Sequence, residues 1–368
     1  MVKVKLLYLI TRATKSGPIQ VVENILDYID SNKFDLYLIS IEKEIPERSI
    51  LDTFKNRFRS YQYIPVSKKE ALLGYFAQLR NAIKKINPDV VHSNGIVPDL
   101  IINKICPGKQ LIIAHANYHV DYYYLCGKVK GELMAKLHIH LMKKARVCIA
   151  CSESLSQIYK KDGLILPYIR NGVNIEPLKT YDKRELRKEL GLPLNKKIYI
   201  YAASFNSRKN QEFLLTTFSK FLNDDILLLL GDGPTYESVK SVEHSNNVIL
   251  AGRKSDVKPY LRASDYFISS SLQEGMPMGV LEGMAEGLPV VLSDIDQHRE
   301  LFRVNKSIGV LFRNNSIESL MKAIKKIELM DYSKTSNNSY NTVLNHFNSK
   351  TMSEKYQQQY INIANNNR

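Results

Sequence analysis

Short apolar runs rich in Ile, Leu and Val alternate with segments of helical periodicity along the chain. Each run is far shorter than the ~20 apolar residues that a membrane-spanning helix needs, and its length suits a strand buried in a parallel sheet. The runs lie at residues 4–10, 35–41, 90–93, 111–114, 147–151, 197–203, 226–230, 248–251, 266–269 and 289–292. This alternation predicts an α/β fold with parallel sheets in both halves of the chain.

The length of 368 residues predicts two domains, each with its own core. A polar stretch with Gly and Pro begins at Asn171, and a charged helix is expected over residues 181–190. We place the boundary there. The expected parts are an N-terminal domain at 1–175, a C-terminal domain at 176–345, and a tail at 346–368 that forms a surface helix and packs back on the N-terminal domain.

Composition excludes several classes of protein. A hydrophobic content of 44% with 24% charged residues excludes disordered, collagen-like and membrane-embedded chains. Four cysteines are too few for a disulfide scaffold, and Cys148 and Cys151 fit buried strand thiols better than a zinc or redox pair. The first apolar run stops at Arg12 without a cleavage site, so we expect a cytoplasmic protein.

The net charge of +15 is uneven, because basic residues exceed acidic ones by 11 in residues 1–170 and by 4 in residues 171–368. This excess suggests an anionic partner, which can be a nucleic acid, a membrane surface or a phosphorylated substrate. Residues 128–144 predict a helix with Lys128, Lys136 and Lys143 on one side, either solvated or held against anionic lipid. The other side is expected to gather its apolar residues: Leu133, Met134, Leu137 and Leu141.

The strongest chemical pattern follows the run at 266–269, where a Gly/Pro-rich loop precedes a helix that is expected to start near Met278. A helix N-terminus after a strand and loop presents unpaired N–H groups to an anion. Glu274 lies in the loop and Glu282 in the helix, with seven residues between them. Such carboxylates can accept hydrogen bonds from a sugar or ribose, although a helix cap and a solvated glutamate would look the same.

This segment resembles the Glu-x7-Glu signature of retaining glycosyltransferases of family 4. Four further segments, all N-terminal to this one, match the family in their order and spacing: Ala150-Cys-Ser-Glu-Ser, Arg170-Asn-Gly-Val-Asn, Gly231-Asp-Gly-Pro and Val248-Ile-Leu-Ala-Gly. The resemblance covers roughly residues 140–330 well and the first half loosely. It implies the GT-B fold, in which two Rossmann-like domains face each other across a cleft that holds the substrates.

The resemblance also implies roles for individual residues. Glu274 would contact hydroxyls of the donor sugar, and Glu282 would hold the ribose of the nucleotide. The backbone N–H groups of Met278, Gly279 and Val280 would approach the sugar and the diphosphate. Small residues at such positions permit close approach of the backbone.

Cations for the diphosphate are expected after the run at 197–203. Lys209 matches the family's lysine, whereas Ser204 stands where the family has an arginine. Loss of that bidentate group would weaken stabilisation of the leaving group unless Arg208 or Arg253 replaces it.

In the first half, the resemblance places Gly17 in a loop over the donor phosphates, although the family's Gly-Gly pair is Gly-Pro here. His115 follows the run at 111–114, where the family has an active-site histidine near the donor sugar and the acceptor. His119 is the alternative, and a structural histidine is the other interpretation of either residue.

The expected activity is transfer of a sugar from a nucleotide-diphosphate sugar, most often a UDP-sugar in this family, to an acceptor hydroxyl with retention of configuration. The acceptor would be a saccharide or a lipid-linked saccharide in surface polysaccharide or glycoconjugate assembly. No metal or other cofactor is expected, and Asp294-Ile-Asp is a weak candidate for a metal site.

Two alternatives come from other classes of protein. A basic nucleic-acid-binding protein would fit the charge, but no stretch interleaves aromatic and basic residues as single-strand binders do. A catalytically weakened family member that acts as a scaffold would fit Ser204. Nicotinamide chemistry is disfavoured because no G-x-G-x-x-G motif occurs.

Overall fold

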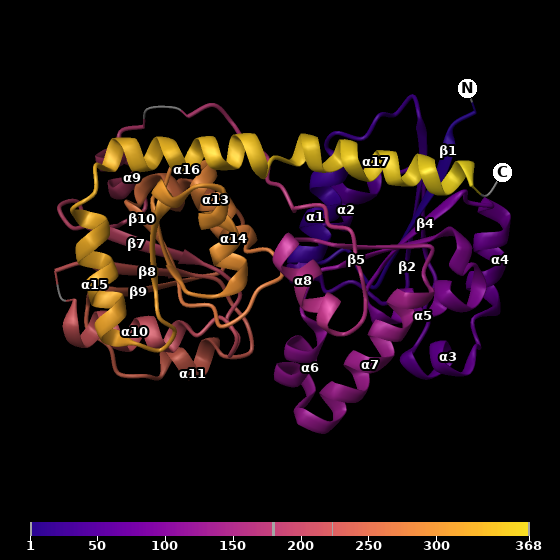
Figure 1. Ribbon diagram of the computed structural model, residues 1–368, viewed down its shortest axis with the longest axis horizontal. Helices are drawn as coiled ribbons and strands as arrows, with labels where there is room; N and C mark the ends of the chain where they lie inside the picture. The colour runs from indigo at the N-terminus through magenta and orange to yellow at the C-terminus, as the bar shows by residue number, and fades with distance from the viewer. Residues whose placement is uncertain (1, 179–180, 223, 367–368) are drawn as a thin grey trace. The chain divides into compact units, whose positions relative to one another are not determined.

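The computed structural model describes residues 2–178, 181–222 and 224–366. Its contacts divide the chain into two compact units. The N-terminal unit comprises Met1–Gly172 and Ser349–Arg368, and the C-terminal unit comprises Val173–Asn348. Each unit is an α/β body with its own sheet and its own helical layers (Figure 1).

The N-terminal unit is built on a six-stranded parallel sheet with the order β3-β2-β1-β4-β5-β6. This is the strand order of a Rossmann-like fold. Its strands are β1 (Val4–Ile10), β2 (Phe34–Ser40), β3 (Ser60–Tyr63), β4 (Val90–Asn94), β5 (Gln110–Ala114) and β6 (Val147–Ala150).

Helices cover this sheet and connect its strands. They are α1 (Gly17–Leu26), α2 (Leu51–Phe54), α3 (Lys68–Leu73), α4 (Ala77–Ile86), α5 (Ile96–Ile105), α6 (Tyr118–Cys126), α7 (Lys128–Lys144), α8 (Glu153–Lys161) and the last helix of the chain, α17 (Ser349–Asn365). Three short 3-10 helices accompany them: η1 (Pro46–Arg48), η2 (Lys55–Arg57) and η3 (Pro107–Lys109).

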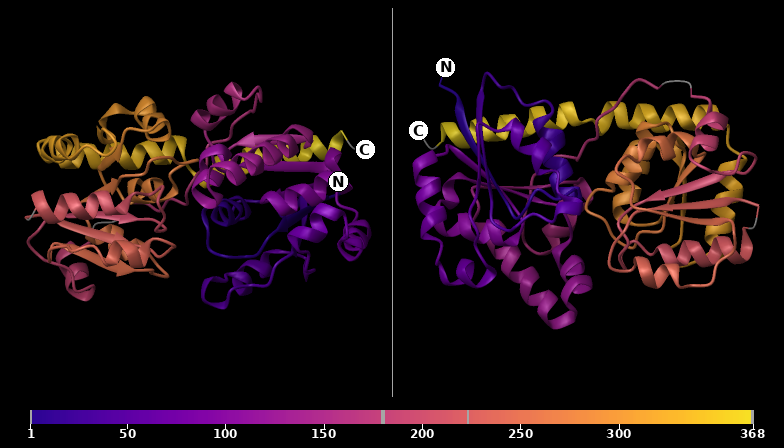
Figure 2. Two further views of the ribbon diagram at one scale, coloured as in Figure 1. Left: turned by 90° about the horizontal axis from the view of Figure 1, so that it is seen from below. Right: turned by 180° about the vertical axis from the view of Figure 1, so that it is seen from behind.

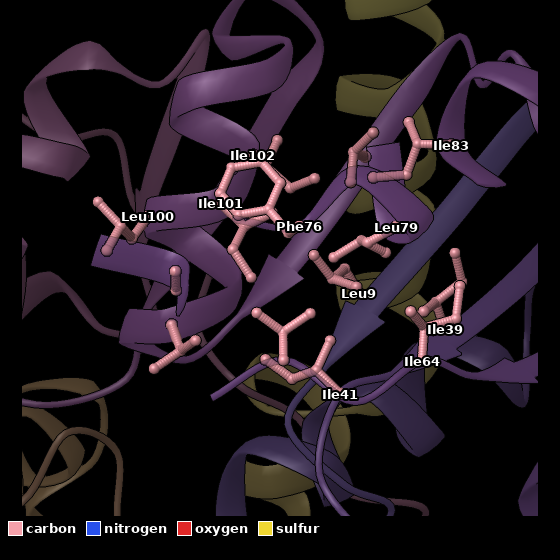
Figure 3. Packing of buried hydrophobic residues seen from close by; sticks show 14 of the residues in the cluster. Leu9, Ile39, Ile41, Ile64, Phe76, Leu79, Ile83, Leu100, Ile101 and Ile102 are labelled. Atoms are coloured by element: carbon pink, nitrogen blue, oxygen red, sulfur yellow. The ribbon is translucent and has the colours of Figure 1, made fainter. Parts of the chain in front are cut away.

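One core cluster of this unit joins the central strands to the helices on one face of the sheet (Figure 3). Leu9 of β1 and Ile39 of β2 pack there with Leu79 of α4 and Ile101 of α5. All four side chains are fully buried. Burial of such a side chain contributes about 1.5–3 kcal/mol, so the cluster fixes the helices on the sheet whose strand ends carry the loops.

The C-terminal unit repeats the same topology, with the strand order β12-β11-β10-β7-β8-β9 and parallel pairing throughout. Its strands are β7 (Ile198–Ala202), β8 (Ile226–Leu230), β9 (Val248–Gly252), β10 (Tyr266–Ser269), β11 (Val290–Ser293) and β12 (Gly309–Phe312). Its helices are α9 (Lys183–Glu189), α10 (Gln211–Phe221), α11 (Tyr236–Lys240), α12 (Lys258–Ala263), α13 (Met278–Ala285), α14 (Asp296–Val304), η4 (Lys306–Ile308), α15 (Ile317–Glu328) and α16 (Tyr332–His346).

Helix α17 returns to the N-terminal unit and packs on α1, β1 and β4, as two further views show (Figure 2). Its Tyr360 is fully buried, and the hydroxyl lies 2.9 Å from Nδ1 of His92 and 3.2 Å from the hydroxyl of Tyr8. Ser353 donates a hydrogen bond of 2.7 Å to the carbonyl oxygen of Ile25. The last described helix is therefore a structural part of the first sheet's packing.

The prediction of parallel α/β sheets in both halves is confirmed. All ten predicted strands occur, with bounds that shift by one residue at most at each end. Strands β3 and β12 were missed. Among the described residues, no helix has the length and apolar character to cross a membrane.

The prediction for the faces of the helix at 128–144 is partly wrong. Helix α7 has the predicted bounds, but Leu133 is exposed and Leu137 is only half-buried. The helix instead buries a side that includes Ala135, His138 and Met142. His138 is buried because Asp99 and Tyr122 satisfy both of its ring nitrogens, which the hydrophobic pattern cannot reveal.

Candidate functional site

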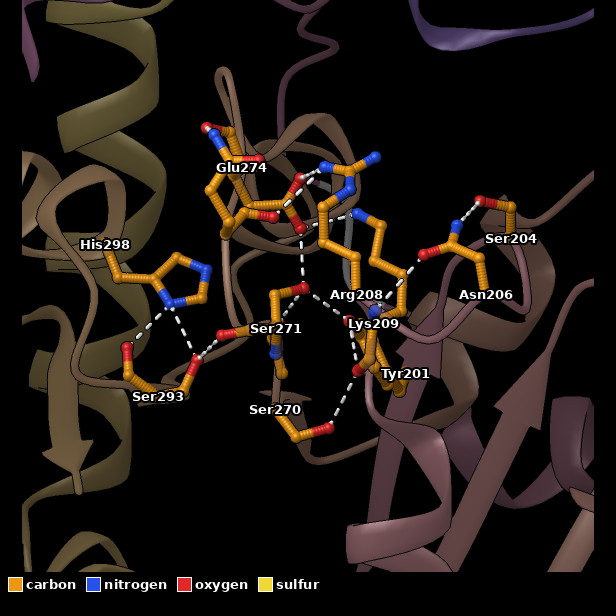
Figure 4. Close-up of polar contacts among 12 residues, drawn as sticks. Tyr201, Ser204, Asn206, Arg208, Lys209, Ser270, Ser271, Glu274, Ser293 and His298 are labelled. Carbon is orange, nitrogen blue, oxygen red and sulfur yellow. Dashed lines mark hydrogen bonds and ion pairs between the residues drawn. The ribbon is translucent and has the colours of Figure 1, made fainter. Parts of the chain in front are cut away.

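Glu274 and Lys209 meet at the carboxyl edge of the C-terminal sheet (Figure 4). Lys209 lies in the loop between β7 and α10, and Glu274 lies in the loop between β10 and α13. Because β7 and β10 are parallel neighbours, their loops leave the sheet side by side. The lysine Nζ lies 2.5 Å from Oε1 of Glu274, a short charge-assisted contact.

Two further side chains contact the Glu274 carboxylate, and a third contacts one of these two. Ser271 donates a hydrogen bond of 2.6 Å to its Oε1, and the Tyr201 hydroxyl lies 2.7 Å from Oγ of Ser271. Nη1 of Arg208 lies 3.6 Å from the carboxylate Oε2 and donates to the carbonyl oxygen of Gln273 at 3.0 Å. The carboxylate is thus oriented before any ligand arrives.

The surroundings keep Glu274 ionised although its residue is only 5% exposed. Burial raises the pKa of the carboxyl, but the charges of Lys209 and Arg208 and the hydrogen bonds to it lower that pKa more, so the net shift is downward. A buried carboxylate with adjacent cations can accept hydrogen bonds from hydroxyl groups, and the cations can bind a phosphate.

Helix α13 starts four residues after Glu274, and no side chain caps its N-terminus. A Cβ atom on Gly279 would lie 2.6 Å from the carbonyl oxygen of Ala202, so this position needs glycine for the helix to lie against the end of β7. Met278 and Gly279 are half-buried and Val280 is buried. The three predicted backbone positions therefore lie in the first turn of a helix that points its partial positive charge outward from the sheet edge.

Of the other predicted donor residues, Ser204 and Arg253 lie in loops after strands, and Glu282 lies in helix α13. Ser204 is exposed after β7, and its Oγ accepts a hydrogen bond of 3.1 Å from Asn206. Arg253 is exposed after β9, with its Nη1 3.9 Å from a carboxylate oxygen of Asp232. Glu282 is half-buried in the second turn of α13.

The loop after β8 is pressed against the loop after β7 by the glycines of Gly231-Asp-Gly-Pro. Gly231 has a φ of +137°, and a Cβ there would lie 2.0 Å from the carbonyl oxygen of Ala203. Gly233 approaches Phe205 equally closely. These glycines bring two strand-end loops together, which is a packing reason for the motif.

In the N-terminal unit, His115 follows β5 and is half-buried, and its Nε2 is buried without a hydrogen-bond partner. Burial and the nearby His138 lower its pKa to about 4, so the ring is neutral near pH 7. The alternative, His119, is paired in the α6–α7 region: its Nδ1 lies 2.9 Å from Glu132 and its Nε2 3.4 Å from Asp162. Of the two histidines, His115 has the unsatisfied nitrogen.

Gly17 is the first residue of α1 rather than part of the preceding loop. A Cβ at this position would meet no atom within 4 Å, so nothing in the protein itself requires glycine there. Its expected place beside a phosphate stays a prediction.

The fold brings several residues to the site that were not predicted. Tyr201 lies within the buried strand β7, where nothing in the sequence distinguishes it. Ser271 is the last of three consecutive serines, a pattern that is visible in the sequence but not specific to a site. His298 lies on α14, where its Nδ1 donates to the carbonyl oxygen of Ser293 at 2.7 Å (Figure 4). Burial lowers the His298 pKa to about 4, and Ser293 in turn donates to the carbonyl oxygen of Ser271 at 2.6 Å.

The described residues contain no group of three or more His, Cys, Asp and Glu side chains arranged to hold a metal ion. Asp294, from the weak Asp-x-Asp candidate, forms a two-point ion pair with Arg299 at 2.6 and 2.8 Å. Cys148 and Cys151 are both buried, and neither forms a disulfide.

Comparison with known families covers both units. The model described as Glycosyltransferase Family 4 matches residues 17–177, and the model described as Glycosyl transferases group 1 matches residues 182–342. The chain is a glycosyltransferase of family 4. The predicted family and its GT-B fold are thereby confirmed.

Two proteins with a sequence similar to that of this chain come from bacteria. The putative teichuronic acid biosynthesis glycosyltransferase TuaC of Bacillus subtilis is 26% identical over 258 residues, which is 67% of this chain and 62% of TuaC. The UDP-Gal:alpha-D-GlcNAc-diphosphoundecaprenol alpha-1,3-galactosyltransferase of Escherichia coli is 27% identical over 55% of this chain and 56% of its own. The chain thus spans about three fifths of the length of these relatives.

Among solved structures, Anabaena HepE in complex with UDP superposes with a TM-score of 0.78 at 17% identity. The match covers 96% of this chain and 99% of HepE. HepE has also been solved with UDP-glucose. At this identity the likeness establishes a shared fold.

Proposed function

We propose that this glycosyltransferase transfers a sugar from a UDP-sugar to an acceptor hydroxyl with retention of the anomeric configuration. The observation that carries the proposal is the preformed Glu274–Lys209–Arg208 cluster at the strand ends beside the uncapped start of α13. The complexes of HepE with UDP and UDP-glucose support a UDP-sugar donor. The names of the relatives TuaC and the galactosyltransferase support an acceptor from surface polysaccharide assembly, either a saccharide or a lipid-linked saccharide.

The rate-limiting event in such a transfer is departure of the diphosphate, on which negative charge grows. Lys209, Arg208 and the N–H groups of Met278, Gly279 and Val280 would stabilise that charge. Glu274 is ionised, so it would accept hydrogen bonds from hydroxyls of the donor sugar and orient its anomeric carbon. Glu282 would hold the ribose, and Ser204 and Arg253 would lie nearer the nucleotide.

No residue of raised pKa is needed as a base in this scheme, because the leaving phosphate takes the proton of the acceptor hydroxyl. We assign His115 to the acceptor side, where its unpartnered Nε2 would hydrogen-bond a substrate hydroxyl as a neutral ring. Gly17 would let the start of α1 approach the donor phosphates. The scheme uses no metal ion.

The deciding experiment combines a donor screen with product analysis. Thermal shift with a panel of nucleotide sugars should select a UDP-sugar, since a ligand at 100 times its Kd stabilises by about 2.7 kcal/mol. NMR of the product made with that donor should show the donor's anomeric configuration. An inverted product, or stabilisation by no nucleotide sugar, would contradict the proposal.

A matched pair of variants tests the carboxylate. Glu274→Gln keeps the size of the side chain and its hydrogen bond from Ser271 but removes the charge, so transfer should fall at least a hundredfold while the fold persists. Asp294→Asn makes the same change on a half-buried carboxylate that is paired with Arg299, and it should leave transfer unchanged.

We also propose that the enzyme works at the cytoplasmic face of a membrane, held by the basic N-terminal unit. Residues 1–170 carry the larger part of the excess positive charge, and Lys128, Lys136 and Lys143 of α7 are all exposed. Each lysine near an anionic surface contributes about 1 kcal/mol at moderate salt. Reversing these three charges to Glu should abolish binding to anionic vesicles at low salt, and unchanged binding would refute the placement.

A further inference from the structure

Helices α6 and α7 form an antiparallel hairpin whose turn at Gly127 projects from the N-terminal unit (Figure 1). Large apolar side chains are exposed on both sides of the turn. Leu125 is 71% exposed, Val129 83% and Leu133 71%, and Tyr123 and Tyr124 are exposed as well. Outside this hairpin, no eleven-residue stretch of the described chain exposes more than three such side chains. We call these five residues the hairpin tip.

Along α7 one exposed stripe changes from apolar to basic with distance from the turn, while Lys128 and Lys130 flank Val129 at the turn itself. At 100° per residue, Val129, Leu133 and Lys136 fall within roughly 60° of one another, and His140 and Lys143 continue the same stripe. Lys136 lies about 10 Å along the helix axis beyond Val129, at 1.5 Å per residue. The stripe therefore places apolar groups at the end and cations about two turns behind them.

The hairpin is rigidly anchored to its unit. A Cβ on Gly131 would lie 2.6 Å from the carbonyl oxygen of Tyr122, so the two helices are in close backbone contact. Buried His138 of α7 contacts the Tyr122 hydroxyl and Oδ2 of Asp99 on α5, each at 2.8 Å. These contacts fix the base of the hairpin on its unit. The hairpin tip is therefore exposed on a well-packed element and not on an unstructured segment.

We propose that the hairpin tip inserts into the interfacial layer of an anionic lipid bilayer. Apolar groups enter such a layer by about 5–10 Å, tyrosines lie at its polar boundary, and long lysine side chains reach back to the headgroups. The hairpin tip with Lys128 and Lys130 beside it, and Lys136 and Lys143 behind it, fits this layering. Residues 118–144 contain five lysines and two acidic residues, so the hairpin complements a negative surface.

This inference rests on the membrane placement proposed above. It adds that the hairpin tip inserts apolar side chains into the bilayer, in addition to the attraction between lysines and anionic lipid. It also ties the contact to the site. Helix α6 begins three residues after His115, and Tyr118 at its start stacks on His138 with ring centroids 3.9 Å apart. A bilayer that holds the tip would therefore present a lipid-linked acceptor to the segment that carries His115.

The chain contains no tryptophan, so one introduced tryptophan reports its own surroundings without background. Val129→Trp should show a blue shift of its emission with vesicles of phosphatidylglycerol and phosphatidylcholine, and brominated lipid should quench it. The matched control is Leu329→Trp, at a residue that is 88% exposed in the C-terminal unit, and its emission should not change. Emission of Val129→Trp that stays unshifted on bound protein would overturn the inference.

A second measurement separates insertion from charge. The triple variant Leu125→Gln, Val129→Gln and Leu133→Gln keeps every lysine and a good helix former at each position, so the fold should persist. Its partition into the same vesicles should fall at least tenfold, and the remaining binding should disappear at 0.5 M salt. Leu329→Gln should bind as the parent protein does.

The outcomes distinguish this inference from the function on which it rests. If the triple variant binds vesicles as tightly as the parent but the lysine reversal abolishes binding, insertion is wrong and the electrostatic placement stands. If the parent is a dimer in light scattering and the triple variant a monomer, the tip contacts a second copy and the inference fails. Transfer to a soluble acceptor should be equal in the parent and the triple variant.

Discussion

The two units share one strand order but place their charges differently. In the C-terminal unit, a carboxylate and two cations gather at the strand ends, and Glu274 stays ionised although it is buried. In the N-terminal unit, the residue at the corresponding edge is His115, which is neutral near pH 7, and the exposed lysines of α7 lie on the surface.

This difference indicates a division of labour on a common scaffold. A preorganised charge cluster suits a reacting group whose charge changes, because the electrostatic stabilisation is in place before the reaction. A neutral ring suits hydroxyl recognition, and outward lysines suit attraction of a larger anionic partner. Duplicated topology thus says little about function until the strand-end residues are compared.

The largest expected effect is on the charge cluster. Lys209→Met removes the cation beside Glu274 and should lower kcat by about 10²–10³, a loss comparable to removal of one group that stabilises a transition-state anion. Lys209→Arg is the control and should retain most of the activity because it keeps the charge. Steady-state kinetics with the selected donor measures both, and a kcat for Lys209→Met within threefold of the parent would contradict the role.

The next effect tests the buried polar network around Asp99 in the N-terminal unit. Asp99→Ala removes the buried carboxylate that pairs with Nε2 of His138 and accepts the hydrogen bond of Ser93, so it should lower the free energy of unfolding by about 3 kcal/mol. Asp294→Ala breaks an exposed ion pair and should cost at most about 1 kcal/mol. Denaturant unfolding measures the two losses, and UDP binding by folded Asp99→Ala should be unchanged. Equal losses of unfolding free energy in Asp99→Ala and Asp294→Ala would contradict the prediction that the buried contacts of Asp99 stabilise the protein more than the ion pair of Asp294.

Acid should destabilise the C-terminal unit through His298. The folded pKa of about 4 lies below the unfolded value of 6.5, so the unfolded state binds the proton first as the pH falls. Stability from the neutral ring is complete above pH 6.5 and decreases below it, by about 2 kcal/mol at pH 5. Hydrogen exchange of the C-terminal sheet between pH 7 and 5 should show this slope, and His298→Asn should flatten it. An identical slope in His298→Asn would exclude this histidine as the cause.

The smallest effect concerns the missing arginine. Ser204 is exposed in the loop after β7, so Ser204→Arg can be accommodated without a loss of packing. A bidentate cation near the diphosphate should raise kcat/KM by about threefold to tenfold, which corresponds to roughly 1 kcal/mol. Ser204→Gln adds length without charge and serves as the control. An equal gain in both variants would attribute the effect to something other than charge.

Sequence reasoning predicted most of the sheets because buried parallel strands are apolar runs. Strands β1, β8 and β10 have the predicted bounds. It missed β3, which lies at the edge of its sheet with a polar sequence and two exposed residues, so no apolar run marks it. It also missed β12, a four-residue edge strand that begins with Gly309.

The sequence predicted that Lys209 and Glu274 each lie in a loop after a recognisable strand, and the resemblance to family 4 assigned both of them to the donor. Tyr201, Ser271 and His298 were not predicted, since only the pairing of strands and the packing of α14 bring them to the cluster. The exposed tip of α7 was missed for a related reason. A helical wheel assigns Leu133 to the core. In the structure the side of α7 that carries His138 is buried, because His138 contacts Tyr122 and Asp99, and Leu133 is exposed.

Helix α17 has a consequence for how the chain is made. The C-terminal unit is an insertion within the N-terminal one, bracketed by the bridge between Val173 and Asn348. A nascent chain that has left the ribosome only as far as residue 348 lacks Tyr360 and the cover over Tyr8 and His92. The N-terminal unit is synthesised first but can complete its packing only after α17 has emerged, whereas the C-terminal unit can fold before that.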